Sequence, residues 1–146
     1  MKCYAVIDTN VIVSAFLSIQ NCSNLEDSTP FKVLKVILDN RNKIIPIFND
    51  EILEEYREVL SRPFFKISKN IIGKFINDIR SVGLYFEKSE IFEKMPDPKD
   101  VVFYQVVMEG KKTQDSYLVT GNLKHFPKKE FIVTPSEFLE ILSEKK

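Results

Sequence analysis

The sequence predicts an α/β fold, with one domain over residues 1–146, a mostly parallel central sheet and helices on both faces. Short apolar runs alternate along the chain with segments whose apolar residues recur at helical spacing. Such alternation is typical of parallel strands joined by right-handed helical crossovers. The chain has no internal repeat or interdomain linker, and 146 residues suffice for one hydrophobic core. In sheets of this kind, functional side chains gather where strand carboxyl ends meet the following helices.

The first elements form a strand and two helices. Cys3–Ile7 is a continuous apolar run and predicts a buried strand. The apolar residues at 11–17 and at 31–38 have helical spacing, and both segments predict helices. The polar residues at 21–30 predict a loop between these two helices.

The next pair is a strand at Ile44–Phe48 and a helix at Asp50–Leu60. Pro46 lies within the strand and cannot donate a ladder hydrogen bond, so it predicts an edge position or a bulge. Asn49 is a good N-cap for the helix, and Pro63 ends it.

The carboxyl-terminal half continues the alternation and ends in a helix. Thr134, Pro135 and Glu137 predict the start of that helix, as N-cap, first-turn proline and capping-box acid. The elements before it are a helix at 68–81, a short extended piece at 84–86, a helix at 98–109 that ends at Gly110, and strands at 117–119 and 131–133.

The composition narrows the class of protein. Lys and Arg number 21 and Asp and Glu number 21, and this balance argues against avid, non-specific binding to duplex nucleic acid. Cys3 and Cys22 form no disulfide framework or zinc spacing, which favours a reducing cytoplasm. The apolar residues after Lys2 resemble a signal peptide, but Asp8 interrupts them. We therefore expect a cytoplasmic protein without a membrane span.

Asp8 stands at the end of the first predicted strand, and Thr9 and Asn10 follow it. An acid is costly to bury there unless something pairs with it. One interpretation is an N-cap, because all three residue types cap helices well. The other is a site for a hard divalent cation, which would offset the repulsion between carboxylates gathered from distant parts of the chain.

Glu55 is the acid of its helix that lies beside the apolar stripe. At about 100° per residue, Glu51, Glu54 and Glu58 point well away from that stripe. Glu55 is therefore the best placed to face the edge of the sheet. The alternative is a boundary residue paired with a nearby lysine or arginine.

Asp97 and Asp100 open the helix at 98–109. One interpretation is that Asp97 is the N-cap and Asp100 the reciprocal capping residue. The other is that Asp97 caps the helix while Asp100 holds a cation.

Thr120, Gly121 and Asn122 close the strand at 117–119. Gly121 predicts a positive φ or a close backbone approach, and Asn122 fits either a turn or a site. Asp115 precedes the same strand and belongs at its opposite end. His125, the only histidine, is expected to be a structural or phosphate contact rather than a catalytic base. Basic residues near these junctions, some of which could follow a phosphate backbone, are Lys99, Lys111, Lys112, Lys124, Lys128 and Lys129.

Taken together, these segments resemble a PIN domain, in the branch of toxins from prokaryotic toxin–antitoxin pairs. The resemblance covers essentially the whole chain and rests on the order and spacing of its motifs. They lie at residues 8–11, 54–56, 59–63, 97–100, 118–122 and 125–127.

The resemblance implies a three-layer α/β/α sandwich and a Mg²⁺- or Mn²⁺-dependent ribonuclease that cleaves single-stranded or looped RNA. It also implies a homodimer and a cognate antitoxin. The family's metal-binding acids match Asp8, Glu55 and Asp100. The family's fourth acid matches Asn122, an amide without charge, which weakens a second metal site. Hydrogen-bonding or helper positions match Thr9, Asn10, Thr120 and Asp97.

Two other interpretations remain from the sequence. One is a degenerate PIN-like module that binds RNA or protein without catalysis, which Asn122 favours. The other is a phosphoryl-transfer enzyme or receiver domain. A phosphatase of that kind needs a second acid where the chain has Asn10, and a receiver needs an acidic pair where only Asp8 is present.

Overall fold

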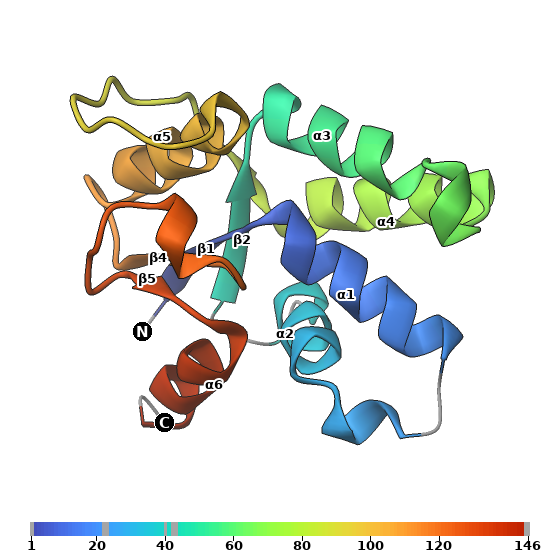
Figure 1. The fold of residues 1–146 in the computed structure, drawn as a ribbon. Helices are drawn as coiled ribbons and strands as arrows, with labels where there is room; N and C mark the ends of the chain where they lie inside the picture. Colours follow the sequence, from blue (N-terminus) through green and yellow to red (C-terminus); the bar gives the residue numbers. More distant parts are fainter. Residues whose placement is uncertain (1, 22–23, 40, 42–43, 145–146) are drawn as a thin grey trace.

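The computed structural model describes residues 2–21, 24–39, 41 and 44–144, and places five strands in one sheet of order β3-β2-β1-β4-β5. Every pairing between neighbouring strands is parallel. Figure 1 shows the helices around this sheet. The strands are β1 Cys3–Ile7, β2 Ile44–Phe48, β3 Leu84–Tyr85, β4 Ser116–Val119 and β5 Ile132–Val133.

Helices cover both faces of the sheet, which confirms the predicted three-layer α/β architecture. Helix α5 packs on β1, β2 and β4, and Figure 1 shows the strands between α5 and the α1–α4 group. Helix α6 contacts α2, β4 and β5. The helices among the described residues are α1 Thr9–Gln20, α2 Thr29–Leu38, α3 Asp50–Leu60, α4 Lys69–Val82, α5 Val101–Gly110 and α6 Pro135–Glu144.

Local sequence signals fix several helix starts. The Asn49 side chain accepts a hydrogen bond from the Ile52 amide at 2.9 Å, so the predicted N-cap of α3 is confirmed. The predicted capping box of α6 is also confirmed. The Thr134 amide donates to Glu137 Oε1 at 2.9 Å, and the Glu137 amide donates to Thr134 Oγ1 at 3.2 Å. These side chains satisfy amides that a helix start leaves without partners.

Short 3₁₀ turns lie between several of the elements, and two of them bear on the predicted boundaries. The turn η1 at Leu25–Asp27 lies in the polar interhelical segment, and α2 begins at Thr29. The turn η3 at Pro98–Asp100 precedes α5, so the α-helix starts later than predicted. The others are η2 Pro63–Phe65 and η4 Leu123–His125. The expectation for Cys22 falls outside the described residues, while Cys3 is buried in β1.

The prediction that Pro46 marks an edge or a bulge is wrong. Pro46 pairs in regular register with Ala5, and β2 lies between β1 and β3. The short β3 explains how a proline fits there. It pairs only with Ile47 and Phe48, so the ladder on that side begins after Pro46.

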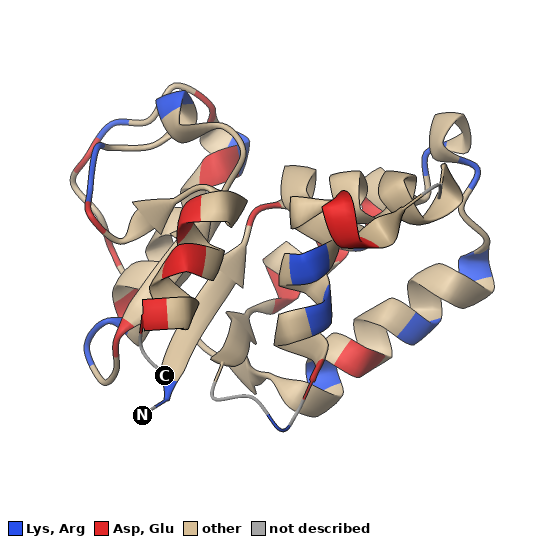
Figure 2. Ribbon diagram, turned by 90° about the horizontal axis from the view of Figure 1, so that it is seen from below, with Lys and Arg blue, Asp and Glu red and all other residues tan. Residues whose placement is uncertain are grey.

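Both signs of charge occur on the outer helices, but individual helices differ. In Figure 2, α6 carries only acidic charges and α2 only basic ones. Among the described residues, no helix is both long enough and apolar enough to cross a membrane.

The two ends of the sheet hold different residues. Ile7 and Val119 pair with each other at the carboxyl ends of β1 and β4, so Asp8 and Thr120 leave the sheet side by side. At the amino ends, the Tyr4 amide donates to the Asp115 carbonyl at 2.8 Å. Asp115 therefore lies at the end opposite Asp8, as expected.

Candidate active site

A cleft of about 360 Å³ opens at the carboxyl edge of the sheet. It receives side chains from the β1–α1 junction, from α3, from the turn before α5 and from the segment after β4. The residues expected from sequence that line it are Asp8, Thr9, Asn10, Glu55, Asp97, Asp100 and Asn122. Thr120, also expected, does not line the cleft; it is fully buried and hydrogen-bonded to Asp8.

Asp8 is oriented by side chains and not by helix capping. Thr120 Oγ1 donates to Asp8 Oδ2 at 2.7 Å, and Asn10 Nδ2 donates to the same oxygen at 3.1 Å. Asp8 occupies the N-cap position of α1, yet its carboxylate makes no capping hydrogen bond. The N-cap interpretation of Asp8 is therefore correct for its position at the start of α1 and wrong for a capping hydrogen bond from its side chain. The side chains of Thr120 and Asn10 both donate to Oδ2, and neither donates to Oδ1.

Burial makes the Asp8 carboxylate costly to ionise. The residue is 4% exposed, and this burial raises its pKa from the ordinary 3.8 to about 6. The Thr120 hydrogen bond lowers the pKa, whereas the negative charges of Asp100 and Glu55 raise it. A buried acid beside two others is a group that a cation would stabilise in its charged form.

Glu55 occupies the position that its periodicity predicted. It is partly buried, while Glu51, Glu54 and Glu58 on the same helix are exposed. Glu55 Oε2 accepts a hydrogen bond from Thr9 Oγ1. Burial raises the pKa of Glu55, and the Asp100 charge raises it further, against the opposing effect of the Thr9 hydrogen bond.

Asn10 and Thr120 join the β1–α1 junction to the segment after β4. Asn10 Oδ1 accepts from the Gly121 amide at 3.1 Å, while its Nδ2 donates to Asp8. Thr120 Oγ1 accepts from the Asn122 amide at 3.0 Å while it donates to Asp8. These bonds fix the backbone beside the Asn122 side chain, which lines the cleft.

The prediction of a positive φ at Gly121 is wrong, because none of the glycines has a positive φ. A Cβ at Gly121 would lie 3.5 Å from Asn10 Oδ1, an ordinary contact. The close approach at this residue is the hydrogen bond from its amide to Asn10.

Asp97 and Asp100 have different partners. Asp97 Oδ1 accepts from the Lys99 amide at 2.9 Å and so caps the turn η3, as expected. Asp100 makes no capping hydrogen bond; instead its Oδ2 lies 3.1 Å from His125 Nδ1. Burial raises the pKa of Asp100, the Asp97 charge raises it further, and the contact with His125 lowers it. The reciprocal capping interpretation of Asp100 is therefore wrong.

Tyr56 follows Glu55 in the motif at residues 54–56, and the sequence predicted no hydrogen bond for its side chain. It is buried, its ring packs near Phe75 and Phe103, and its hydroxyl donates to the Ile7 carbonyl. This bond ties α3 to the residue before Asp8. The residues around Tyr56 could not predict this hydrogen bond, because its acceptor is a backbone carbonyl of β1, far away in the sequence.

The cleft offers hard oxygen donors to a cation. Carboxylate and amide oxygens suit Mg²⁺ and Mn²⁺. Among the described residues, however, no group of three or more His, Cys, Asp or Glu side chains is arranged to hold an ion directly. Mg²⁺ usually keeps several of its waters. The donor set therefore fits an ion held partly through water.

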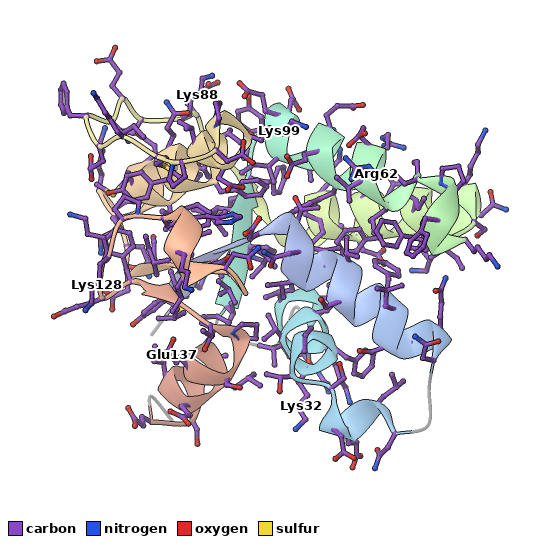
Figure 3. All side chains as sticks on the ribbon, in the orientation of Figure 1. Lys32, Arg62, Lys88, Lys99, Lys128 and Glu137 are labelled. Atoms are coloured by element: carbon purple, nitrogen blue, oxygen red, sulfur yellow. The ribbon has the colours of Figure 1, made fainter. Side chains whose placement is uncertain are left out.

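Three of the six lysines expected near the junctions are distinguished by their contacts. Lys99 lines the cleft, and Figure 3 shows it close to α3, the helix that carries Glu55. Lys111 and Lys112 follow the carboxyl end of α5, where Lys111 lies over the Phe131 ring and Lys112 pairs with Glu109. Lys99 is thus a candidate phosphate contact, and the latter two are not.

Comparison with known proteins gives one match. The family model described as a PIN domain matches residues 4–124, from within β1 to within the turn η4. No curated protein and no solved structure matches the chain. The matched segment contains every residue that lines the cleft except His125. The sequence match and the α/β architecture agree, and the chain belongs to the PIN-domain family.

Proposed function

We propose that the chain is a Mg²⁺- or Mn²⁺-dependent endoribonuclease that cleaves single-stranded or looped RNA. PIN domains are generally nucleases, and the chain belongs to that family. The main support for this proposal is the environment of the Asp8 side chain. It is a buried carboxylate with a raised pKa, and it shares one cleft with Glu55 and Asp100. Strongly perturbed acids gathered in a cleft are typical of catalytic sites.

In this proposal Asp8, Glu55 and Asp100 hold the divalent ion, partly through water. When bound, the ion lowers the pKa of a water nucleophile and offsets negative charge on the scissile phosphate. The three carboxylates converge from elements far apart in sequence, and only the fold brings them together.

The surrounding residues orient these acids. Thr120 and Asn10 donate to Asp8 Oδ2 and so orient the carboxylate that would hold the ion. Thr9 holds Glu55 by its hydroxyl. Asp97 caps the turn that presents Asp100. Asn122, whose amide oxygen carries no charge, positions the attacking water or the scissile group. No histidine base is required.

Lys99 is proposed to contact the RNA backbone at the rim of the cleft. It is exposed and has no ion-pair partner among the residues that the structure describes. Because the net charge is zero, the protein has no overall positive charge to attract RNA. We therefore expect RNA to bind through local contacts such as Lys99.

The cellular role is proposed on family resemblance alone. We propose a cytoplasmic toxin of a toxin–antitoxin pair, inhibited by a cognate antitoxin and assembled as a homodimer. Light scattering on the purified protein tests the dimer. Growth arrest on expression of the wild type, but not of Asp8→Asn, tests the toxin role.

A degenerate module that binds RNA or protein without catalysis is the second candidate. Asn122 favours it, since the family's fourth acid is an amide here. A binding module need not take up Mn²⁺, whereas the nuclease must. Titration with Mn²⁺ therefore separates the two candidates.

Cleavage of an end-labelled, structured RNA in Mn²⁺ tests the proposed activity. We expect cleavage by the wild type that EDTA abolishes. Asp8→Asn should cut the rate by more than about 100-fold, since losing even an outer partner of a metal ligand costs about 10–100-fold.

Asp115→Asn is the matched control, because Asp115 is an aspartate at the other end of the same sheet. It should cleave as the wild type does. Retained cleavage in folded Asp8→Asn would remove Asp8 from the mechanism. No cleavage of several RNAs by folded, Mn²⁺-loaded wild type would favour the binding module.

A further inference from the structure

The proposed reaction leaves His125 without a role, although the structure brings it into the cleft. Its Nδ1 lies 3.1 Å from Asp100 Oδ2. The His125 side chain is 46% exposed and that of Asp100 is 14% exposed, so the imidazole stands on the solvent side of the acid. Because the imidazole is exposed, it adds little packing energy to the core. We therefore consider a functional role for it.

The backbone fixes the position of His125. It ends the turn η4, in which the His125 amide donates to the Asn122 carbonyl at 3.0 Å. The next residue, Phe126, is 6% exposed, and its amide donates to the Leu123 carbonyl at 3.2 Å. One buried side chain and two backbone bonds therefore hold the imidazole beside Asp100, so its placement does not depend on that contact alone.

We propose that His125 Nδ1 is a metal ligand alongside Asp100, so that the cleft prefers first-row transition ions to Mg²⁺. This inference rests on the proposed function, because it concerns the same divalent ion.

The distance between the two atoms supports shared ligation. Donors on adjacent corners of an octahedral ion with bonds of about 2.1 Å are about 3.0 Å apart. The observed separation of 3.1 Å between Asp100 Oδ2 and His125 Nδ1 is that of the hydrogen bond between them, and it also leaves both atoms close enough to bind one ion. Without an ion, the two atoms share one hydrogen bond, whose donor depends on the tautomer of the ring. With an ion bound, the proton sits on Nε2 and the ring stays neutral.

The types of side chain in the cleft support the preference for first-row transition ions over Mg²⁺. Asn122 brings no charge to the cleft, and His125 lies three residues beyond it in the same segment. An imidazole nitrogen is softer than a carboxylate oxygen and suits first-row transition ions, whereas Mg²⁺ prefers oxygen. Affinity for a nitrogen-containing site rises from Mn²⁺ to Co²⁺. The preference over Mg²⁺ should therefore be larger for Co²⁺ than for Mn²⁺.

Calorimetric titration of the full chain with Mg²⁺, Mn²⁺ and Co²⁺, each without RNA, tests this ligand. His125→Ala should lose Co²⁺ affinity by at least about tenfold and Mn²⁺ affinity by less, with Mg²⁺ affinity nearly unchanged. His125→Asp supplies an oxygen in place of the nitrogen and should raise the ratio of Mg²⁺ to Co²⁺ affinity. Lys128→Ala is the control, since Figure 3 shows Lys128 well away from Lys99 and α3. It should bind all three ions as the wild type does.

Two results would overturn the inference. If His125→Ala lowers the affinity for all three ions by the same factor, His125 acts only by orienting Asp100. If it changes none of them, His125 plays no part in binding the ion. Either result leaves the proposed nuclease intact as long as the wild type binds Mn²⁺ and cleaves RNA. A folded wild type that binds none of the three ions would overturn the nuclease proposal as well.

Discussion

The two ends of strands β1 and β4 use polar side chains in different ways. At the carboxyl ends, Asp8 accepts from Thr120 and Asn10, so side chains bind one another around a buried acid. At the amino ends, polar side chains bind the backbone. Ser116 Oγ donates to the Gln114 carbonyl at 3.0 Å, and Gln114 Nε2 donates to the Lys2 carbonyl at 2.6 Å.

Packing follows the same division. At the amino ends, a Cβ on Gly110 would lie 2.6 Å from Ile47 Cδ1 and 2.9 Å from Ser116 Oγ, so no space is left. At the carboxyl ends, a cleft of about 360 Å³ separates the elements. Buried Ser116 satisfies the backbone at one end, whereas buried Asp8 raises the free energy of the folded state at the other. A polar group retained at a cost to stability points to function.

The largest expected effect is on the pH dependence of the free energy of unfolding, through Asp8 in the cleft. The raised pKa of Asp8, about 6 against 3.8, corresponds to about 3 kcal/mol at about 1.36 kcal/mol per pKa unit. Because the pKa of Asp8 is higher in the folded state, protonation of Asp8 favours folding. This contribution to the free energy of unfolding is present below about pH 4 and is lost as pH rises through about 6. Asp8→Asn removes this titration. Its free energy of unfolding, relative to the wild type, should therefore rise by up to about 3 kcal/mol from pH 4 to pH 7.

Urea unfolding of both proteins at the two pH values measures that difference. A difference between wild type and Asp8→Asn that stays constant with pH would mean that Asp8 is not strained by burial.

The amino ends should respond to packing alone. Gly110→Ala should lower the free energy of unfolding by about 1–3 kcal/mol, because its Cβ has no room, and should leave Mn²⁺ affinity unchanged. Gly73→Ala, in α4, is the matched control. A Cβ there meets nothing within 4 Å, so this helix substitution should stabilise by up to about 1 kcal/mol. Thermal or urea unfolding checks both. Unchanged stability in Gly110→Ala would show that the amino ends are less tightly packed than described.

The smallest expected effect distinguishes the lysines at the two ends of α5. Lys99→Ala should weaken RNA binding by about fivefold and lower the salt dependence of log affinity by about 0.7–1. Lys112→Ala, whose side chain pairs with Glu109 away from the cleft, should change neither. Fluorescence anisotropy with a labelled single-stranded RNA at several salt concentrations measures both quantities. Equal effects of the two substitutions would argue against an RNA path along the cleft.

Short-range patterns in the sequence predicted much of the fold. The alternation of apolar runs predicted the parallel sheet, the periodicity around Glu55 predicted its partial burial, and Asn49 and Thr134 predicted two helix starts. Each of these signals spans a few residues and reflects backbone geometry. Pro46 was misjudged because its tolerance depends on the length of β3, which lies far along the chain.

Long-range contacts in the cleft could not be predicted in the same way. The hydroxyl of Tyr56 binds a carbonyl of β1, Asn10 binds the Gly121 amide, and His125 contacts Asp100 across 25 residues of sequence. Capping was a sound local interpretation of Asp8 and Asp100, but their carboxylates turn to partners that only the assembled sheet supplies. Local signals therefore located the acids but could not decide between helix capping and a place in the cleft.

Calorimetric titration of Mn²⁺ into the wild type, Asp8→Asn and Asp115→Asn tests the central claim most directly. The account predicts binding by the wild type and by Asp115→Asn with the same affinity, and a loss of binding in Asp8→Asn. Circular dichroism should show all three proteins folded. Binding of Mn²⁺ by Asp8→Asn as tightly as by the wild type would contradict the claim that the carboxyl edge of the sheet is the metal-binding site.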